Sequence, residues 1–290
     1  MMMHAFKIRP LALSIAVAAT LGSVYLPQSS AVVTDDTQTG QPVIGIHEGT
    51  FLDTIDVHNT GRIEGLMTGI DNRGTIDTIN NEGTITSGRN VIINLPTGSI
   101  GTINNMGRIV TEQGYAIMNN GHIGVINNSG IIETTGNTAI IHAGTSTLDE
   151  INNSGLIRSP VAISVYGPLG KLTNSGTIEG WLDIRSPLTV IGGMSNIGTL
   201  TGYSTDGNPT VGRLMMFNGD LDFAGGNTLL NDHVQIYDGY KVLNSGANLY
   251  LSGPITINGT MDTGPTRYEQ SERASLNIIV SNDVSAHTGN

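Results

Sequence analysis

The chain has 290 residues and a net charge of −11, with no cysteine, 39 glycines, 4% aromatic and 13% charged residues. The large side chains that fill compact cores are scarce, so an ordinary globular enzyme is disfavoured. The absence of cysteine excludes a disulfide scaffold and any thiolate metal or redox site. The excess of acidic residues disfavours nucleic acid and anionic membranes as partners.

The first 31 residues have the features of a cleavable signal peptide. Lys7 and Arg9 precede an apolar run over 11–21 that is too short to span a bilayer, and a Ser-Ser-Ala sequence ends at Ala31. We predict cleavage after Ala31 and export through the general secretion route. An uncleaved anchor is the alternative, disfavoured because Pro27 ends the apolar run early. Cleavage would take the net charge from −11 to −13 and leave no transmembrane segment in the mature chain.

A short motif, Asn-x-Gly-x-Ile or a close variant, recurs along the chain at steps of 21 to 25 residues. Its copies begin at Asn59, Asn81, Asn105, Asn128, Asn153, Asn174 and Asn196. A second series of corner glycines runs out of phase with the first at steps of 23 or 24 residues, through Gly74, Gly98, Gly121 and Gly144. Two series with one period indicate a unit of about 23 residues with at least two corners, each followed by a short apolar strand.

The spacing within a unit predicts strands and turns. Over 75–85, Ile76, Ile79 and Ile85 are separated by polar residues and a turn, and they lack the helical i, i+3, i+4, i+7 stripe. Coils built from strands stack about 4.8 Å apart and bury their inward side chains in columns. Leucine-rich repeats are the structural alternative, but they need a leucine-rich convex segment where this chain is polar.

We therefore predict an all-β fold, a right-handed parallel β-helix with coils of about 23 residues. The signal peptide at 1–31 is followed by a polar tail or loose cap over 32–49. Regular coils occupy 50–200, and a less regular, strand-rich continuation of the solenoid occupies 201–290. Two turn signals within 202–212 predict a long loop or a seam between the two solenoid parts.

Pairs of asparagines occupy equivalent places in four successive units: Asn80-Asn81, Asn104-Asn105, Asn127-Asn128 and Asn152-Asn153. Stacked amides can donate to one coil and accept from the next, so we expect a hydrogen-bonded ladder. Asparagine also tolerates the left-handed backbone of a tight corner. A glycan-binding strip is the alternative interpretation.

The leader, followed by coils such as GTIDTINNEGTI, GSIGTINNMGRI and GHIGVINNSGII, resembles the passenger domain of an autotransporter, a type V secreted protein of Gram-negative bacteria. The resemblance covers about 50–200, and the segment from Leu214 resembles the later rungs of such passengers. It implies a translocator barrel of roughly a dozen strands in the outer membrane. No segment from Met215 to Asn290 is long or aromatic enough for this barrel. We expect a passenger truncated before the translocator, a split product, or a solenoid presented by a separate translocator.

Catalytic motifs are missing from the sequence. The seven histidines include no His-x-x-x-His pair, and neither Gly-x-Ser-x-Gly nor Gly-Asp-Ser-Gly occurs. We expect His122 and His142 to be exposed polar residues near corners, not metal ligands. The Gly-rich nonapeptide that binds calcium between coils is also absent. The sequence therefore predicts no catalytic residue, no cofactor and no metal.

The best enzyme alternative comes from β-helix polysaccharide lyases and hydrolases. Asp220 and Asp222 lie two residues apart on a predicted strand and point to the same side, as paired acids for glycosidic cleavage could. An exposed strand face has the same pattern. A cleft lined by three or more convergent acids and a basic residue within one to three coils would favour an enzyme, whereas a smooth polar face would favour a binding protein.

We expect a non-enzymatic adhesin that contacts glycans or proteins on host or bacterial surfaces, and a carbohydrate-active enzyme is the alternative. The expected location is the cell surface if a translocator is joined to the chain, and otherwise the periplasm.

Overall fold

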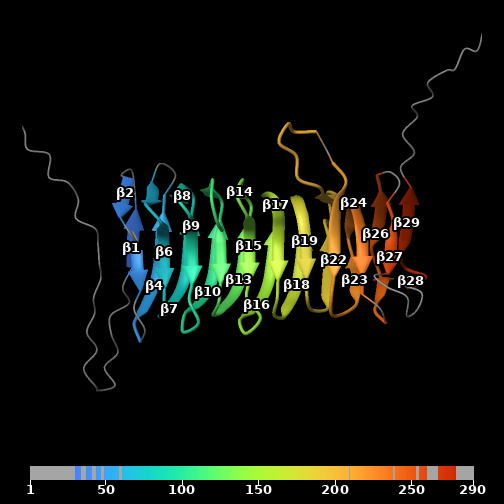
Figure 1. Ribbon diagram of the computed structural model, residues 1–290, viewed down its shortest axis with the longest axis horizontal. Helices are drawn as coiled ribbons and strands as arrows, with labels where there is room; N and C mark the ends of the chain where they lie inside the picture. The colour runs from blue at the N-terminus through green and yellow to red at the C-terminus, as the bar shows by residue number, and fades with distance from the viewer. Residues whose placement is uncertain are drawn as a thin grey trace, which may run out of the picture.

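The computed structural model describes residues 30–33, 37–40, 44–46, 49–58, 61–208, 210–237, 239–252, 255–259 and 267–278. Within these ranges the chain forms 29 β-strands and no helix, and it winds into one elongated solenoid (Figure 1). Strands of successive coils pair in parallel, for example β7 (Thr75–Asn81) with β10 (Ser99–Asn105). The predicted all-β parallel solenoid is confirmed, and a leucine-rich repeat is excluded.

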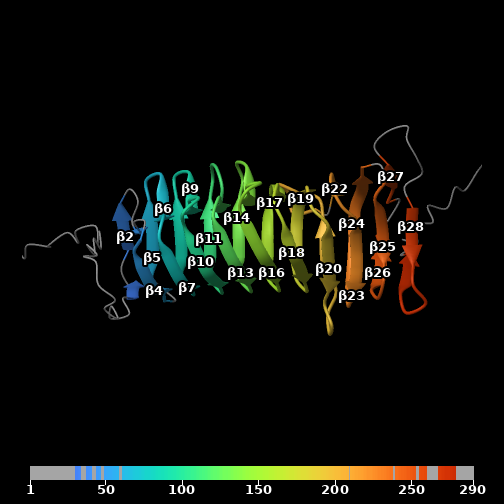
Figure 2. The ribbon, with the colours of Figure 1, turned by 90° about the horizontal axis from the view of Figure 1, so that it is seen from below.

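Each regular coil contains three strands joined by tight corners. In the coil over 75–94, β7 is followed by β8 (Thr84–Ser87) and β9 (Asn90–Asn94). Equivalent strands of successive coils lie side by side, so the coils build three columns that run the length of the solenoid (Figures 1 and 2).

The first column is an 11-stranded sheet. In spatial order it contains β1 (Ser30–Val33), β4 (Phe51–Val57), β7, β10, β13 (His122–Asn128), β16 (Thr147–Asn153), β18 (Leu169–Asn174), β20 (Leu188–Gly192), β23 (Leu221–Gly225), β25 (Lys241–Asn244) and β28 (Arg267–Gln270).

The second and third columns are joined by three long strands into an 18-stranded sheet. The long strands are β17 (Leu156–Val165), β19 (Thr177–Ile184) and β24 (Asn227–Ile236). The second column also contains β2 (Thr37–Gly40), β5 (Arg62–Gly65), β8, β11 (Arg108–Thr111), β14 (Ile131–Thr134), β21 (Gly198–Thr201), β26 (Asn248–Leu251) and β29 (Ser275–Ile278). The third also contains β3 (Ile44–Ile46), β6 (Thr68–Asn72), β9, β12 (Ile117–Asn119), β15 (Thr138–His142), β22 (Gly212–Met216) and β27 (Ile257–Gly259).

The strand register reproduces the period found in the sequence. Ile103 aligns with Ile79 in the coil before it and with Ile126 in the coil after it, and Ile126 aligns in turn with Ile151. Each step equals one repeat of the Asn-x-Gly-x-Ile motif. Parallel stacking therefore superimposes chemically equivalent residues, as the columns of a solenoid require.

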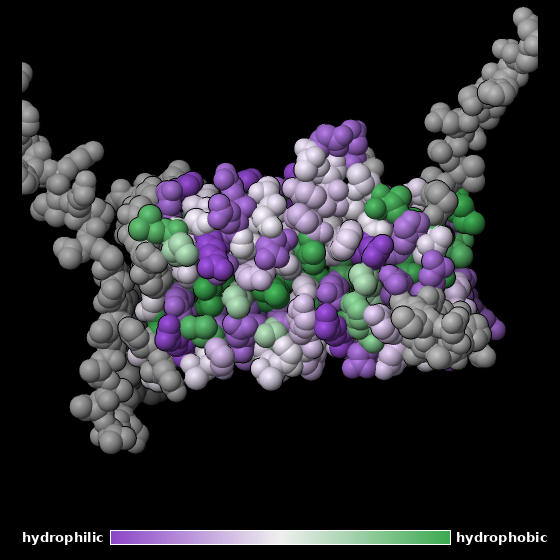
Figure 3. All heavy atoms as spheres, in the orientation of Figure 1, coloured by the Kyte–Doolittle hydropathy of each residue, from purple (hydrophilic) through white to green (hydrophobic). Residues whose placement is uncertain are grey.

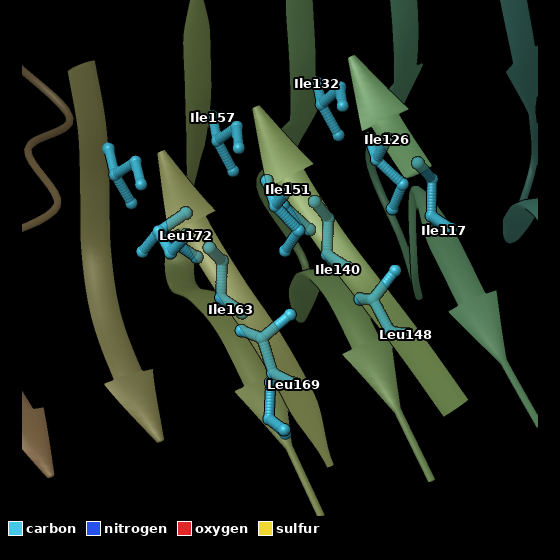
Figure 4. Packing of buried hydrophobic residues seen from close by; sticks show 14 of the residues in the cluster. Ile117, Ile126, Ile132, Ile140, Leu148, Ile151, Ile157, Ile163, Leu169 and Leu172 are labelled. Carbon is cyan, nitrogen blue, oxygen red and sulfur yellow. The ribbon is translucent and has the colours of Figure 1, made fainter. Parts of the chain in front are cut away.

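The core is a continuous stack of aliphatic side chains between the sheets. Ile103, Ile126 and Ile151 are fully buried, as are their neighbours Ile117, Ile140 and Ile163 in the third column. Figure 4 shows Ile126 and Ile151 of the first column and Ile117, Ile140 and Ile163 of the third meeting between the strand columns. Since each apolar side chain packs on its equivalent in adjacent coils, burial is continuous despite the scarcity of aromatic residues.

The corner glycine of the repeat is required by the close approach of successive coils. A Cβ atom on Gly130 would lie 2.1 Å from the carbonyl oxygen of Gly107, and one on Gly155 would lie 2.2 Å from that of Gly130. None of these three glycines has a positive φ. Steric space between coils, not left-handed backbone geometry, explains glycine at these corners.

Three strands extend the solenoid on its N-terminal side. β1 aligns Ala31 with Ile55 of β4, β2 pairs with β5, and β3 pairs with β6. The range 32–49, predicted as a tail or loose cap, thus contains strand pairing where it is described. The predicted cleavage point after Ala31 falls within β1, and residues 1–29 of the predicted leader lie outside the described residues.

The segment predicted as a long loop projects from the solenoid between β21 and β22 (Figure 1). An antiparallel bridge joins Gly202 to Thr210 at its base, where the Gly202 amide donates to the Thr210 carbonyl at 2.9 Å. We call residues 202–211 the projecting loop. After it, strands β22 to β29 continue the same parallel stacking.

Candidate functional site

The second asparagine of each pair forms a buried ladder that holds the coils together. Asn81 Nδ2 donates to Asn105 Oδ1 at 2.6 Å, and the same bond is repeated from Asn105 to Asn128, from Asn128 to Asn153 and from Asn153 to Asn174 at 2.7–2.8 Å. All five amides also donate to a backbone carbonyl of the next coil, as Asn105 does to Ile131 at 3.1 Å. The predicted ladder is confirmed, and its buried members have a structural role.

The first asparagine of each pair forms a second ladder on the outer face of the first column. Asn104 Nδ2 donates to Asn80 Oδ1 at 2.9 Å, and Asn127 and Asn152 continue the series at 2.9 and 3.0 Å. At the other end, Asn80 donates to Asp56 Oδ1 at 2.8 Å. These amides are half-buried and border a groove of about 380 Å³. We call this row the outer asparagine ladder.

A third ladder was not expected from the paired asparagines. Asn72 Nδ2 donates to Asn94 Oδ1, and Asn94 donates to Asn119 Oδ1, both at 2.8 Å. The next rung is His142, whose Nδ1 lies 3.3 Å from Asn119 Nδ2. These residues end the third-column strands and follow the common period, so their spacing was the signal that could have revealed them.

The expectation that His142 is exposed is wrong, because the side chain is fully buried. Its Nδ1 also contacts Ser146 Oγ at 2.7 Å, and its Nε2 lies 3.0 Å from the Pro168 carbonyl oxygen. This arrangement suits the neutral ring with Nε2 protonated, since Nε2 then donates to Pro168 and Nδ1 accepts. Burial lowers the pKa of His142, and the hydrogen bond to Pro168 opposes that effect. His142 thus replaces asparagine in a structural ladder.

His122 is half-exposed at the start of β13, where its Nδ1 lies 2.6 Å from Thr147 Oγ1 in the next coil. Among the described residues, no group of three or more His, Asp or Glu side chains is arranged to hold a metal ion.

Asp220 and Asp222 both accept hydrogen bonds from the following coil. Asp220 Oδ1 accepts from the Lys241 amide at 2.7 Å. Asp222 accepts from the amide and the hydroxyl of Ser245 at 3.2 and 2.9 Å. Each carboxylate therefore pairs with the backbone of the neighbouring coil, so the structure gives both a stacking role that their sequence spacing did not reveal.

A groove of about 530 Å³ lies over the second column and contains a different set of acids. Glu64, Glu112 and Glu133 border it together with Arg108, and we call it the acidic groove. Arg108 approaches Glu133 to 3.6 Å, and Glu64 pairs with Arg62 at 3.0 Å. The three acids and the base are spread over four successive coils, from β5 to β14, whereas the cleft expected of a carbohydrate-active enzyme gathers them within one to three. Glu64 and Glu133 occupy equivalent positions of their repeats, but Arg108 and Glu112 do not, so the sequence spacing did not single out the group.

Arg158 links the acidic groove to the projecting loop. Its guanidinium lies 3.5 Å from Glu133 and 3.2 Å from Glu179, on opposite sides along the column. It also donates to the Ser204 carbonyl oxygen, and the Ser204 amide donates to Glu179 Oε1 at 2.8 Å. These charge-assisted bonds anchor the loop at its base. The loop tip is hydrophilic, and polar and apolar residues are interspersed over the face seen in Figure 3.

Within the loop, Asp206 accepts hydrogen bonds from Ser204 Oγ at 2.6 Å and from the Asn208 amide at 3.0 Å. These bonds, led by the one from Ser204, lower the pKa of Asp206 to about 2. The loop therefore keeps a negative charge at its exposed tip.

Asp232 is a fully buried acid on β24, and neither carboxylate oxygen has a side-chain partner in the described part of the chain. Burial raises the pKa of Asp232 to about 7, and the adjacent Gly212 backbone opposes the rise. A Cβ on Gly212 would lie 2.3 Å from Asp232 Oδ1, so glycine makes room for the carboxyl group.

No protein-family model, curated protein or solved structure matches this chain. Over the residues that the structure describes, no helix is long and apolar enough to cross a membrane. The fold and the surface chemistry are therefore the basis for a functional assignment.

Proposed function

We propose that the chain is a non-enzymatic β-solenoid of the autotransporter-passenger kind, exported to the periplasm and carried to the cell surface when a translocator is joined to it, and that it adheres to glycans or proteins of host or bacterial surfaces. The outer asparagine ladder is the observation that carries this proposal. It repeats one half-buried amide in Asn80, Asn104, Asn127 and Asn152 beside a groove of about 380 Å³.

The ladder leaves part of each amide free for a ligand. Each side-chain amide has two N–H donors and two acceptor positions on its oxygen. The bonds along the ladder use one N–H of Asn104 and one acceptor position of its oxygen. The remaining donors and acceptors are repeated at the coil spacing, about 4.8 Å. A partner with repeated hydroxyl groups can contact several coils at once. Many weak contacts made together then give a higher overall affinity than any one of them.

The acidic groove supports a second candidate function, a carbohydrate-active enzyme. Glycoside hydrolysis needs a pair of carboxyl groups beside the scissile bond. Glu64, Glu112 and Glu133 border one groove with Arg108. Glu64 and Glu133 each pair with an arginine, and a carboxylate beside the scissile bond is the group that supplies the nucleophile or base in this reaction.

One experiment separates the two functions. The purified chain is applied to an array of glycans and matrix proteins, and every bound polysaccharide is incubated with the chain while new reducing ends are measured. We expect binding without cleavage. We also expect Asn104→Ala with Asn127→Ala to weaken binding, whereas Glu64→Gln with Glu133→Gln leaves it unchanged. Cleavage that the glutamate variant abolishes would establish the enzyme instead.

A further inference from the structure

Aromatic and arginine side chains, all but one of them exposed, gather on the outer face of the third column, from β17 to the end of β24. This surface, which we call the arginine–aromatic face, consists of Tyr166, Trp181, Arg185, Arg213, Phe217 and Tyr237. It lies beside the projecting loop and apart from both the outer asparagine ladder and the acidic groove.

Four of these residues form one stack across four successive coils. Each of them directly follows the end of a third-column strand. The Arg185 guanidinium lies 4.2 Å from the ring centroid of Tyr166 and 5.0 Å from that of Phe217. The Phe217 ring lies 4.8 Å from that of Tyr237. Tyr166 and Tyr237 are 42% and 41% exposed, so the stack presents aromatic surface to solvent at both ends.

Trp181 and Arg213 form a second contact on this face. The Arg213 guanidinium lies 5.1 Å from the ring centroid of Trp181, and Trp181 is 46% exposed. Among the described residues, Arg213 has no ion-pair or hydrogen-bond partner. A guanidinium that lies over a ring and has no ion-pair partner keeps N–H groups available, and these match the two oxygens of a carboxylate or sulfate.

Trp181 also borders a pocket of about 270 Å³ at the base of the projecting loop. Pro160 and Val161 of β17 also line this pocket, together with Tyr203 and Val211 of the loop. An indole ring in a small, partly apolar pocket beside polar groups is the type of site that binds a sugar ring through its C–H face.

The charges on this face favour an anionic ligand. Arg185 and Arg213 are both exposed, although the whole chain has a net charge of −11. Asp183 is the acid between them. It is half-buried, and its Oδ1 lies 3.7 Å from Arg185 Nε, so Arg185 offsets its charge. On a strand, residues 181, 183 and 185 point to one side and span about 13 Å.

We propose that the arginine–aromatic face binds an acidic polysaccharide, with one sugar ring against Trp181 and the acidic groups on Arg213 and Arg185. This inference rests on the proposed adhesive function and adds to the outer asparagine ladder a second binding site with its own ligand class. The stack from Tyr166 to Tyr237 provides a surface for further sugar rings along the solenoid axis. Within the described residues Arg213 forms no ion pair, and Arg185 only approaches Asp183 at 3.7 Å. Both guanidiniums can therefore bind a carboxylate or sulfate of the ligand in place of water. This favours acidic sugars over neutral ones.

Trp181 supplies a site-specific probe because it is the only tryptophan in the chain. The full chain is titrated with heparin, which carries sulfates, and with polygalacturonate, which carries only carboxylates, while tryptophan emission is recorded. Dextran is the neutral control, and polyglutamate is the anionic control without sugar rings. We expect saturable changes in emission with one or both acidic polysaccharides, weakened by salt, and none with dextran. Equal responses to dextran or polyglutamate would overturn the proposal.

Variants then test the site by calorimetric titration with the acidic polysaccharide that binds. We expect Arg213→Gln and Trp181→Ala each to weaken binding at least tenfold. The matched control is Arg89→Gln, which removes an exposed arginine at a corner of the β8–β9 coil and should leave affinity within twofold. Circular dichroism and melting temperature confirm that all three variants fold, as expected for outward-facing positions. Unchanged binding by both face variants would overturn the proposal.

Failure of this site is distinguishable from failure of the adhesive function. If the chain binds surfaces in the array and neither Arg213→Gln nor Trp181→Ala changes that binding, the proposed face is wrong and the function stands. If the chain binds no glycan and no protein, the adhesive function itself is wrong.

Discussion

At the scale of single residues, two buried titratable groups occupy the interior of a solenoid that is otherwise aliphatic and amide-lined. His142 and Asp232 are both fully buried. Burial lowers the pKa of His142 and raises the pKa of Asp232 to about 7, because both groups avoid the charged form in a dry interior. The two shifts have opposite consequences for the pH dependence of stability.

His142 is predicted to destabilise the fold in acid. The unfolded chain takes up a proton near the ordinary histidine pKa of about 6.5, whereas the folded chain does so only at lower pH. The contribution of His142 is therefore fully present above pH 6.5 and is lost as the pH falls from 6.5 towards the folded pKa. Asparagine would continue the ladder from Asn119 without titrating.

Chemical unfolding of wild type and His142→Asn between pH 8 and 5 measures this effect. We expect the free energy of unfolding of the wild type to decrease relative to that of the variant below pH 6.5. His122→Asn serves as the control at a half-exposed histidine. Parallel curves for wild type and His142→Asn would contradict the prediction.

Asp232 is predicted to destabilise the fold at neutral pH. The folded pKa of about 7 lies above the ordinary value of 3.8, so the contribution of Asp232 is most favourable below pH 3.8 and is lost as the pH rises to 7. A shift of this size corresponds to at most about 4 kcal/mol above pH 7. Asp232→Asn removes the charge at nearly constant shape and should raise stability at pH 8, with the gain vanishing towards pH 4.

The control for this measurement is Asp77→Asn, which changes an exposed acid on β7. If Asp232→Asn gives no gain at pH 8, or the same gain at pH 4, ionisation of the buried carboxyl group is not the cause.

At the scale of elements, the corner of each repeat couples one coil to the next. The Gly130 amide donates to the Asn105 carbonyl at 3.0 Å, and its Cα approaches the Gly107 carbonyl too closely for a side chain. The neighbouring Asn128 amide bonds to Asn105 and Asn153. Within three residues, the Asn-x-Gly motif thus supplies an asparagine of the ladder and a glycine whose lack of a side chain lets the next coil approach closely.

Gly130→Ala is expected to destabilise the chain by about 1–3 kcal/mol, because the new Cβ would lie 2.1 Å from backbone and must displace it. The adjacent exposed residue provides the comparison, since Ser129→Ala should change stability by less than about 0.5 kcal/mol. Denaturant unfolding measures both values. Equal tolerance at the two positions would show that the corner can open to admit a methyl group.

At the scale of the whole molecule, coils contact only their neighbours, so the solenoid is a one-dimensional array. A continuous core runs through it, and the outer faces differ along its length. The asparagine ladder and acidic groove lie over coils between β4 and β18, whereas the arginine–aromatic face lies over coils from β17 to β24. One continuous solenoid thus presents chemically distinct surfaces.

The predicted leader gives a test of location. When the chain is produced in a Gram-negative host, we expect the mature protein to begin at Val32 by mass spectrometry and to resist protease added to intact cells, as a periplasmic protein does. Fusion to an outer-membrane translocator should make the same solenoid accessible to protease. A known periplasmic protein is the control for membrane integrity. Surface digestion of the unfused chain would instead indicate a separate translocator.

The sequence by itself determined the all-β class, the coil of about 23 residues, the inward isoleucines and the paired-asparagine ladder. These features depend on a period that is visible along the chain, because parallel stacking places equivalent residues one coil apart. The projecting loop was also predictable, since its turn signals are local.

Only the tertiary structure decided the burial of His142, the isolation of Asp232, the acidic groove and the arginine–aromatic face. Arg213 meets Trp181 because the projecting loop lengthens that coil and shifts the sequence separation of stacked residues. Glu112 and Glu133 meet at one groove although they belong to different parts of their repeats. Periodicity specifies which residues superimpose when coil lengths are equal. Where coil length changes or partners lie out of register, the contacts depend on three-dimensional packing that a repeat pattern does not encode.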